Sequence, residues 1–229
     1  MNESVAGSAG SLILYDSSLM VPAPDICWLQ PRWWTSQSAV KAEMRGRGSA
    51  IVVQSPVGLA VLRRFRRGGW VAPLLHDRYW RWSAERSRGF QEFRLLGRLR
   101  AMGLPVPRPL AASFEPAGPF YRAGLLTRFV PETRPLADIA DELTAVEWRA
   151  LASVLQRFFH AGLVHPDLNA RNLLLDNQGQ WFMLDFDRAY LRGRPSAGRQ
   201  MIQRLARSLR KHAGPAGLAG FDQHLRDLV

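Results

Sequence analysis

The sequence has few residues of several kinds, and each shortage excludes a class of protein. Cys27 is the single cysteine, so an intrachain disulfide and a cysteine metal cluster are both impossible. No apolar run approaches the ~20 residues that a membrane-spanning helix needs, and residues 1–18 lack the basic start of a secretory signal. Lysine is nearly absent, with only Lys41 and Lys211, although the formal net charge is +12. The cations are therefore almost all arginine, whose planar fork suits phosphate and other anions.

Three polar residues between His165 and Asp187 have a spacing that points to phosphoryl transfer. The segment HPDLNARN contains Asp167 and Asn172, and LDFD contains Asp185. In the kinase signature H-x-D-L-x-x-x-N the Asp orients the attacking hydroxyl and the Asn holds a metal ion, and the Asp of D-F-G holds metal as well. An ordinary reading as turn and cap residues remains open, because Asp and Asn favour such places.

The chain between these motifs predicts a hairpin. Residues 173–175 are a run of leucines typical of a buried strand, 176–179 read Asp-Asn-Gln-Gly and predict a tight turn, and 181–184 form the returning strand. Because the two strands run side by side, we expect Asn172 and Asp185 to lie close together.

A second group of candidates precedes this segment and would contact a nucleotide. Residues 40–65 predict strands separated by turns, with Gly46 and Gly48 in the first turn, where backbone amides can approach phosphate closely. A plain hairpin turn is an equal alternative for these glycines. Arg63 occupies the strand position at which kinases have their ATP lysine. Its alternative role is as part of a solvated basic turn.

Two further nucleotide-side positions follow from the predicted elements. Residues 84–102 have the apolar spacing of an amphipathic helix, on which Glu92 is the best partner for Arg63, unless it is only a solvated carboxylate. A strand over residues 121–130 would end in a hinge at Phe129 and Val130, whose backbone would take the adenine edge.

The remaining segments limit the kind of acceptor. Residues 143–160 and 199–212 predict helices, but little chain follows Asp187, too little for a protein-substrate platform, so the acceptor is expected to be a small or lipid-linked molecule. Residues 63–82 interleave arginines with aromatic side chains. Such a stretch suits a membrane surface, a nucleic acid, or simply an exposed basic loop.

The sequence resembles the 3-deoxy-D-manno-octulosonic acid (Kdo) kinases, within the lipopolysaccharide-kinase family of the protein-kinase-like fold. The resemblance covers about residues 40–190 and is strongest at RGRG, LRRFRRGGW, GLPVPRP, GLVHPDLNARNLLLD and LDFDRAY. It implies ATP- and Mg²⁺-dependent phosphorylation of a Kdo hydroxyl, the 4-OH, on a lipid A precursor. Asp167 carries over as base and Asn172 and Asp185 as metal ligands. The resemblance also implies a peripheral location at the cytoplasmic face of the Gram-negative inner membrane.

These inferences define the expected architecture and its alternatives. We expect an α+β, two-lobe kinase-like fold with a flexible leader over residues 1–24, an N-lobe over 25–130 and a reduced, mainly helical C-lobe over 131–229. The sequence departs from the protein-kinase pattern at Pro166, where the HRD arginine stands, and at Asp187, where DFG has glycine. Heptose kinases of the same pathway and a non-catalytic nucleotide- or nucleic-acid-binding protein are the alternatives. In the main reading neither a nucleic acid nor an obligate protein partner is expected.

Overall fold

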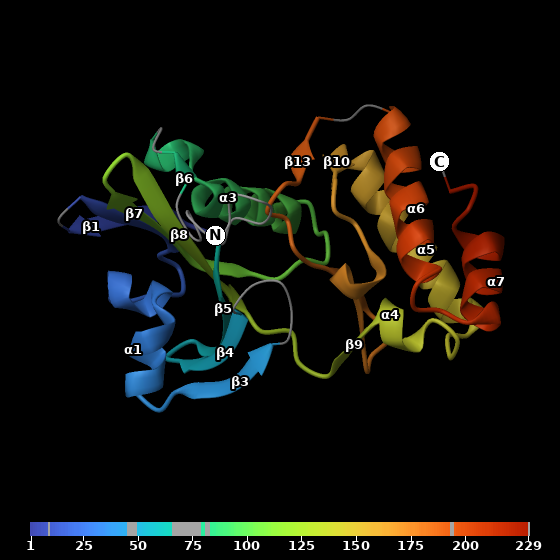
Figure 1. The fold of residues 1–229 in the computed structure, drawn as a ribbon, viewed down its shortest axis with the longest axis horizontal. Coiled ribbons are helices and arrows are strands. Elements are labelled where there is room, and N and C mark those ends of the chain that lie inside the picture. Colours follow the sequence, from blue (N-terminus) through green and yellow to red (C-terminus); the bar gives the residue numbers. More distant parts are fainter. Residues whose placement is uncertain (9, 45–49, 66–78, 81–82, 193–194, 229) are drawn as a thin grey trace. The chain divides into compact units, whose positions relative to one another are not determined.

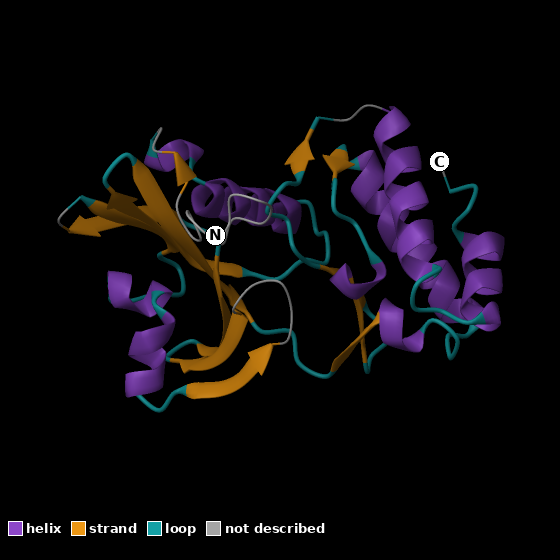
Figure 2. Ribbon diagram, viewed as in Figure 1, coloured by secondary structure: helices purple, strands orange, loops and turns teal. Residues whose placement is uncertain are grey.

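The computed structural model combines a large antiparallel sheet with helices, as Figures 1 and 2 show, so the expected mixture of α and β structure is present. The chain divides into two compact units: unit 1 contains residues 1–97 and 108–129, and unit 2 contains residues 98–107 and 130–229. The structure describes residues 1–8, 10–44, 50–65, 79–80, 83–192 and 195–228.

Unit 1 is built on an eight-stranded antiparallel sheet with the order β1-β2-β7-β8-β5-β4-β3, in which β6 pairs with β8. The strands are β1 (Glu3–Ser8), β2 (Ser11–Asp16), β3 (Val40–Met44), β4 (Ala50–Ser55), β5 (Gly58–Arg64), β6 (Tyr79–Trp80), β7 (Pro109–Ala117) and β8 (Phe120–Arg128). Apolar side chains of β4 and β5 are buried, so the strands predicted between residues 51 and 62 are confirmed.

Helices of unit 1 complete its core. They are η1 (Ile26–Leu29), α1 (Pro31–Ser36), η2 (Ala84–Arg86) and α3 (Arg88–Ala101), whose last residues belong to unit 2. On α1, the buried Trp34 packs in the core with Leu62 and donates from its indole nitrogen to the carbonyl oxygen of Trp28 at 2.7 Å. On α3, a Cβ at Gly89 would lie 3.0 Å from the carbonyl oxygen of Gly124 on β8. Glycine therefore allows α3 to approach the sheet closely.

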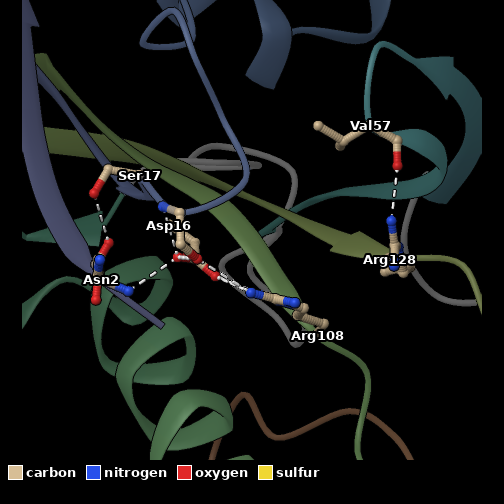
Figure 3. A network of polar contacts seen from close by, with 7 residues as sticks. Asn2, Asp16, Ser17, Val57, Arg108 and Arg128 are labelled. Atoms are coloured by element: carbon tan, nitrogen blue, oxygen red, sulfur yellow. Dashed lines mark hydrogen bonds and ion pairs between the residues drawn. The ribbon is translucent and has the colours of Figure 1, made fainter.

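The flexible leader expected over residues 1–24 is wrong for its first part, because β1 and β2 belong to the sheet. β2 pairs with β7 from Leu12↔Phe114 to Tyr15↔Ala111. At its end, the fully buried Asp16 accepts hydrogen bonds from the backbone of Asn2 and the guanidinium of Arg108 at 2.9 Å, as Figure 3 shows. Burial raises the pKa of Asp16, but the hydrogen bonds from Ser18 and Arg108 outweigh it and hold the pKa below its ordinary value.

Unit 2 contains short strands and the longer helices α5 to α7. Its elements are β9 (Thr133–Pro135), α4 (Leu136–Ile139), α5 (Ala145–His160), β10 (Leu163–Val164), η3 (Ala170–Asn172), β11 (Leu173–Asp176), β12 (Trp181–Met183), β13 (Tyr190–Leu191), α6 (Pro195–Leu209) and α7 (Pro215–His224). The strands form two small sheets, β12-β11-β9 and β10-β13.

Local sequence explains where the helices of unit 2 begin. At α5, Thr144 and Glu147 form a capping box, in which each side chain accepts a hydrogen bond from the other residue's backbone. At α7, the carboxylate of Asp141 accepts from the backbone nitrogens of Gly214 at 2.7 Å and Gly217 at 2.8 Å. The helices predicted over 143–160 and 199–212 are therefore present, although the second begins earlier, at Pro195, a residue suited to a first helical turn.

In the described part of the chain, no helix combines the length and the apolar composition that crossing a bilayer requires.

Candidate functional site

The loop after α5 presents the carboxylate of Asp167 to solvent. Strand β10 leads into this loop, and Leu168 is buried next to Asp167, whose own side chain is 51% exposed. The backbone carbonyl oxygen of Asp167 accepts hydrogen bonds from the side-chain amides of Asn169 at 2.9 Å and Asn172 at 3.3 Å. These bonds hold the main chain of the loop, while the carboxylate faces outward.

The predicted hairpin is present and brings Asn172 close to Asp185. Strands β11 and β12 pair from Leu173↔Met183 to Leu175↔Trp181. Beyond the Leu173↔Met183 pair, at the end of the hairpin away from the turn, the backbone nitrogen of Leu184 donates to the carbonyl oxygen of Asn172 at 2.8 Å. Asp185 is the next residue, so the two predicted metal ligands lie on adjacent backbone segments at the open end of the hairpin.

Asp185 has a backbone conformation that non-glycine residues rarely adopt. Its φ is 62°, in the left-handed region, which costs on the order of 1–3 kcal/mol unless the surroundings stabilise it. Phe186 provides part of that support, because it is buried and its ring lies 5.3 Å from the ring of His165 and 6.4 Å from that of Phe158 on α5. The buried Phe186 holds the segment while Asp185 stays exposed. Strain kept at an exposed carboxylate is a sign of function.

His165 was not selected from the sequence, yet it connects the two motifs. Its ring nitrogen Nε2 lies 3.1 Å from the carbonyl oxygen of Leu184, directly before Asp185. Because a carbonyl only accepts, Nε2 carries the proton. Burial lowers the pKa of His165, so the neutral ring is favoured. The histidine of HPDLNARN therefore fixes the backbone that leads into LDFD, a role that the motif spacing alone does not reveal.

The donors at the hairpin end fit a magnesium ion. Mg²⁺ takes oxygen ligands and usually keeps several waters, needing only one or two protein groups besides phosphate oxygens. The amide nitrogen of Asn172 is occupied by the carbonyl of Asp167, which leaves its amide oxygen as the coordinating end, and Asp185 supplies a carboxylate. Among the described residues no group of three or more His, Cys, Asp or Glu side chains forms a closed metal site.

Arg63 and Glu92 form the ion pair that the sequence predicts. Arg63 lies on β5 opposite Leu125 of β8, and its guanidinium contacts the carboxylate of Glu92 on α3. The side chain of Glu92 is 3% exposed and that of Arg63 is 24% exposed. The guanidinium also lies 5.0 Å from the ring centroid of Phe65. Arg64 points elsewhere, to Glu115 and the carbonyl oxygen of Leu29. Glu92 is thus buried and Arg63 partly buried, and the proposed contact of the pair with nucleotide stays a prediction.

We expect Glu92→Gln to lower the free energy of unfolding by about 3 kcal/mol, because it removes the charge of a buried carboxylate that forms an ion pair with the Arg63 guanidinium. Denaturant unfolding followed by circular dichroism measures this. The matched control is Glu142→Gln, which breaks the Arg134–Glu142 pair, whose side chains are 60% and 61% exposed, and should leave stability unchanged within error. Equal effects of the two substitutions would contradict the assignment of a buried structural pair.

For the other residues predicted to contact the nucleotide, the structure gives less information. Gly46, Gly48 and most of the basic-aromatic stretch over 63–82 lie outside the described residues. Phe129 donates its backbone N–H to the carbonyl oxygen of Leu59 at 3.0 Å, and Val130 accepts from the hydroxyl of Thr133 at 3.4 Å. Unit 1 ends at Phe129 and unit 2 resumes at Val130. Just before this point, Arg128 donates to the carbonyl oxygen of Val57 at 3.0 Å (Figure 3).

Arg188, a residue that the motif spacing does not indicate, lies beside Asp167. Its guanidinium nitrogen Nη1 lies 3.9 Å from Oδ2 of Asp167. The structure thus assembles two groups of candidate residues: Arg63 with Glu92 in unit 1, and Asp167, Asn172 and Asp185 in unit 2, the latter with His165 and Arg188 added.

Comparison with known proteins gives one family. The profile of the lipopolysaccharide kinase (Kdo/WaaP) family matches residues 31–221. This stretch includes every candidate residue named above.

Several similar proteins carry the name 3-deoxy-D-manno-octulosonic acid kinase. The protein of this name from Stenotrophomonas maltophilia strain R551-3 is 44% identical over 80% of this chain and 74% of its own length. One from Xanthomonas oryzae pv. oryzae strain PXO99A is 40% identical over 91% of this chain and 84% of its own. One from Xylella fastidiosa strain 9a5c is 41% identical over 80% and 74%.

Proposed function

The chain belongs to the lipopolysaccharide kinase (Kdo/WaaP) family and is a phosphotransferase that acts on a hydroxyl group, and from this premise we propose a specific reaction. It transfers the γ-phosphate of ATP to a Kdo hydroxyl, the 4-OH, of a Kdo-bearing lipid A precursor, with Mg²⁺ as cofactor. The two compact units correspond in this proposal to the lobes of a protein-kinase-like fold.

The observation that carries the proposal is the connection between Asp167, Asn172 and Asp185 in unit 2. Asn172 contacts the backbone of Asp167 through its side chain and the backbone before Asp185 through its own carbonyl. Both carboxylates are exposed. Structural turn residues would not need an exposed carboxylate on a strained backbone at this point. The kinase signature assigns these residue types to a base and to two metal ligands.

Each residue has a distinct task in the proposed transfer. Asp167 accepts a hydrogen bond from the acceptor hydroxyl, orients its oxygen and takes its proton as the new oxygen–phosphorus bond forms and the bond to ADP breaks. Asn172 and Asp185 would hold the metal ion through their side-chain oxygens. When bound, Mg²⁺ would offset the negative charge of the phosphate oxygens. His165 keeps the backbone before Asp185 in place through Leu184, and Arg63 with Glu92 faces the nucleotide.

The experiment that tests this function follows labelled phosphate from ATP into the acceptor. Purified protein, Mg²⁺ and [γ-³²P]ATP are incubated with lipid A precursors that carry Kdo alone or Kdo with heptose. Label on the Kdo-only acceptor is expected, and phosphate position is then read by NMR of the product. Label that requires heptose would identify a heptose kinase instead. Nucleotide binding without label in any acceptor would identify a non-catalytic binding protein.

A lipid-linked acceptor requires the protein to reach a membrane surface, and helix α6 offers a face for this. Apolar residues of α6 such as Met201, Leu205 and Leu209 are buried. Residues 195–211 contain no Asp or Glu. Their cations are all exposed: Arg199, Arg204, Arg207, Arg210 and Lys211. We therefore propose that this cationic face docks on the anionic inner-membrane surface. No nucleic acid is required in this proposal.

Replacing Arg199, Arg204 and Arg207 by Gln is expected to weaken binding to phosphatidylglycerol vesicles by roughly 100-fold, since each cation near an anionic bilayer contributes about 1 kcal/mol. Vesicle co-sedimentation measures this at fixed salt. A control with the same change of charge replaces Arg134, Arg149 and Arg226, which are also exposed. Similar losses in both variants would show that net charge alone, and not this face, directs binding. Activity on a detergent-dispersed acceptor should be unchanged in either variant.

A further inference from the structure

Arg188 lies next to the proposed base without being needed for the fold. Its side chain is 64% exposed, and the 3.9 Å contact with Asp167 is at the outer limit of an ion pair. Within the described residues this is the single hydrogen bond or ion pair of the Arg188 guanidinium. An exposed pair of this length contributes little to stability. The guanidinium therefore keeps most of its donors for another anion.

Backbone contacts on both sides of Arg188 fix the point from which its side chain extends. On one side Phe186 is buried, and its carbonyl oxygen accepts from the backbone nitrogen of Ala189 at 3.0 Å. On the other side Tyr190 pairs with Val164 on β10, just before the loop that contains Asp167. Arg188 is thus part of a short turn whose ends are fixed near Asp167.

The chemistry of the site makes a cation useful here. Asp167, Asp185 and a nucleotide triphosphate all carry negative charge, so a neutral hydroxyl can approach them, whereas an acceptor that is itself an anion is repelled. The relatives are named as kinases of an octulosonic acid, a sugar with a carboxylate. Arginine binds a carboxylate with two parallel hydrogen bonds, which fixes orientation as well as position.

We propose that Arg188 binds the carboxylate of an acidic sugar acceptor and so places the sugar hydroxyl at Asp167. This inference rests on the proposed function and deepens it, because it makes the acid group the feature by which the acceptor is selected. A neutral heptose offers no such group. Arg188 is a specificity-determining residue whose partner is the substrate, and its contact with Asp167 is exchanged for the acceptor carboxylate on binding.

The test pairs a change in the protein with a change in the acceptor. Wild-type protein and Arg188→Gln are assayed on a Kdo acceptor with its free carboxylate and on the same acceptor converted to the neutral methyl amide. For the acid, Arg188→Gln should lower kcat/KM by about 10- to 100-fold, mainly through a higher acceptor KM. The KM for ATP should be unchanged. For the amide, wild-type and variant should have the same low kcat/KM.

A matched control and a conservative variant separate recognition from structure. Arg192→Gln removes the same charge from an exposed arginine of the same segment, whose guanidinium lies 5.9 Å from the ring centroid of Tyr190, and should behave as wild-type on both acceptors. Arg188→Lys should restore part of the activity on the acid, because it keeps the charge but not the planar fork.

Two kinetic outcomes would overturn the proposal while the proposed function stands. In the first, Arg188→Gln loses the same factor on acid and amide, which would mean that Arg188 acts through Asp167 alone. In the second, wild-type protein uses the amide as well as the acid. If wild-type protein labels no acceptor, the proposed function fails. Calorimetric binding of free Kdo, expected for wild-type and lost in Arg188→Gln, then decides the carboxylate site by itself.

Discussion

Replacing Asp167 with Asn is expected to reduce the turnover of phosphate transfer by at least about 10³-fold, because the amide keeps the shape of the side chain but cannot take a proton. The fold should be retained, since the loop is held by the backbone carbonyl of Asp167 and not by its carboxylate. Initial rates with labelled ATP measure the loss, and thermal unfolding and nucleotide binding show that the protein is otherwise intact.

The control for this substitution is Asp222→Asn. Asp222 is also an exposed carboxylate, 47% exposed, and pairs with an arginine, Arg226, four residues along the chain. It lies on α7, away from the catalytic loop in sequence, and its loss should leave turnover unchanged. If Asp167→Asn kept turnover within about tenfold of wild-type, Asp167 would not be the base, and the loop would need another residue in that role.

Replacing Asp185 with Asn is expected to raise the Mg²⁺ concentration needed for half-maximal rate by at least about tenfold and to lower the maximal rate by about 10²-fold or more. The amide is a weaker ligand than the carboxylate, and Mg²⁺ prefers charged oxygen. Asparagine tolerates the left-handed backbone found at this position, so the backbone should be preserved. Titration of the rate with Mg²⁺ and with Mn²⁺ measures the change.

Asp185→Gly distinguishes the role of the carboxylate from the role of the strained backbone at this position. Glycine adopts a positive φ without steric cost, so this variant should be as stable as wild-type or slightly more stable, yet at least as inactive as Asp185→Asn. Thermal unfolding and rate measurements on both variants make the comparison. A glycine variant with substantial activity would show that the unusual backbone, and not the carboxylate, is what the reaction needs at this position.

Predictions that depended on short separations along the chain were confirmed by the structure. The leucines at 173–175, the Asp-Asn-Gln-Gly turn and the strand after it predicted the hairpin, and β11 and β12 pair as expected. A tight turn leaves little choice of register, so the closeness of Asn172 and Asp185 follows from local chemistry. The Arg63–Glu92 pair spans a longer separation, and it was found because the position of each residue on its own element was predicted correctly.

The prediction of a flexible leader at the N-terminus was wrong because the contacts that order this segment come from residues far away in the sequence. Residues 3–16 include glycine, serine and few strongly periodic positions, which reads as a loose leader. Their order comes from pairing with β7 and from the buried Asp16, whose partner Arg108 is 92 residues away. The strand propensity of a segment does not specify a partner so far away in the sequence. Burial in the sheet outweighs a low local propensity.

The sequence by itself therefore determined the reaction class and predicted the residues for it, because phosphoryl transfer needs particular side chains at spacings that a single loop and hairpin provide. Only the tertiary structure decided what surrounds them. It placed His165 behind Asp185, brought Arg188 to the edge of Asp167, and buried the apolar side of α6 so that its arginines face solvent. These contacts depend on how separate segments pack, which no spacing within one motif specifies.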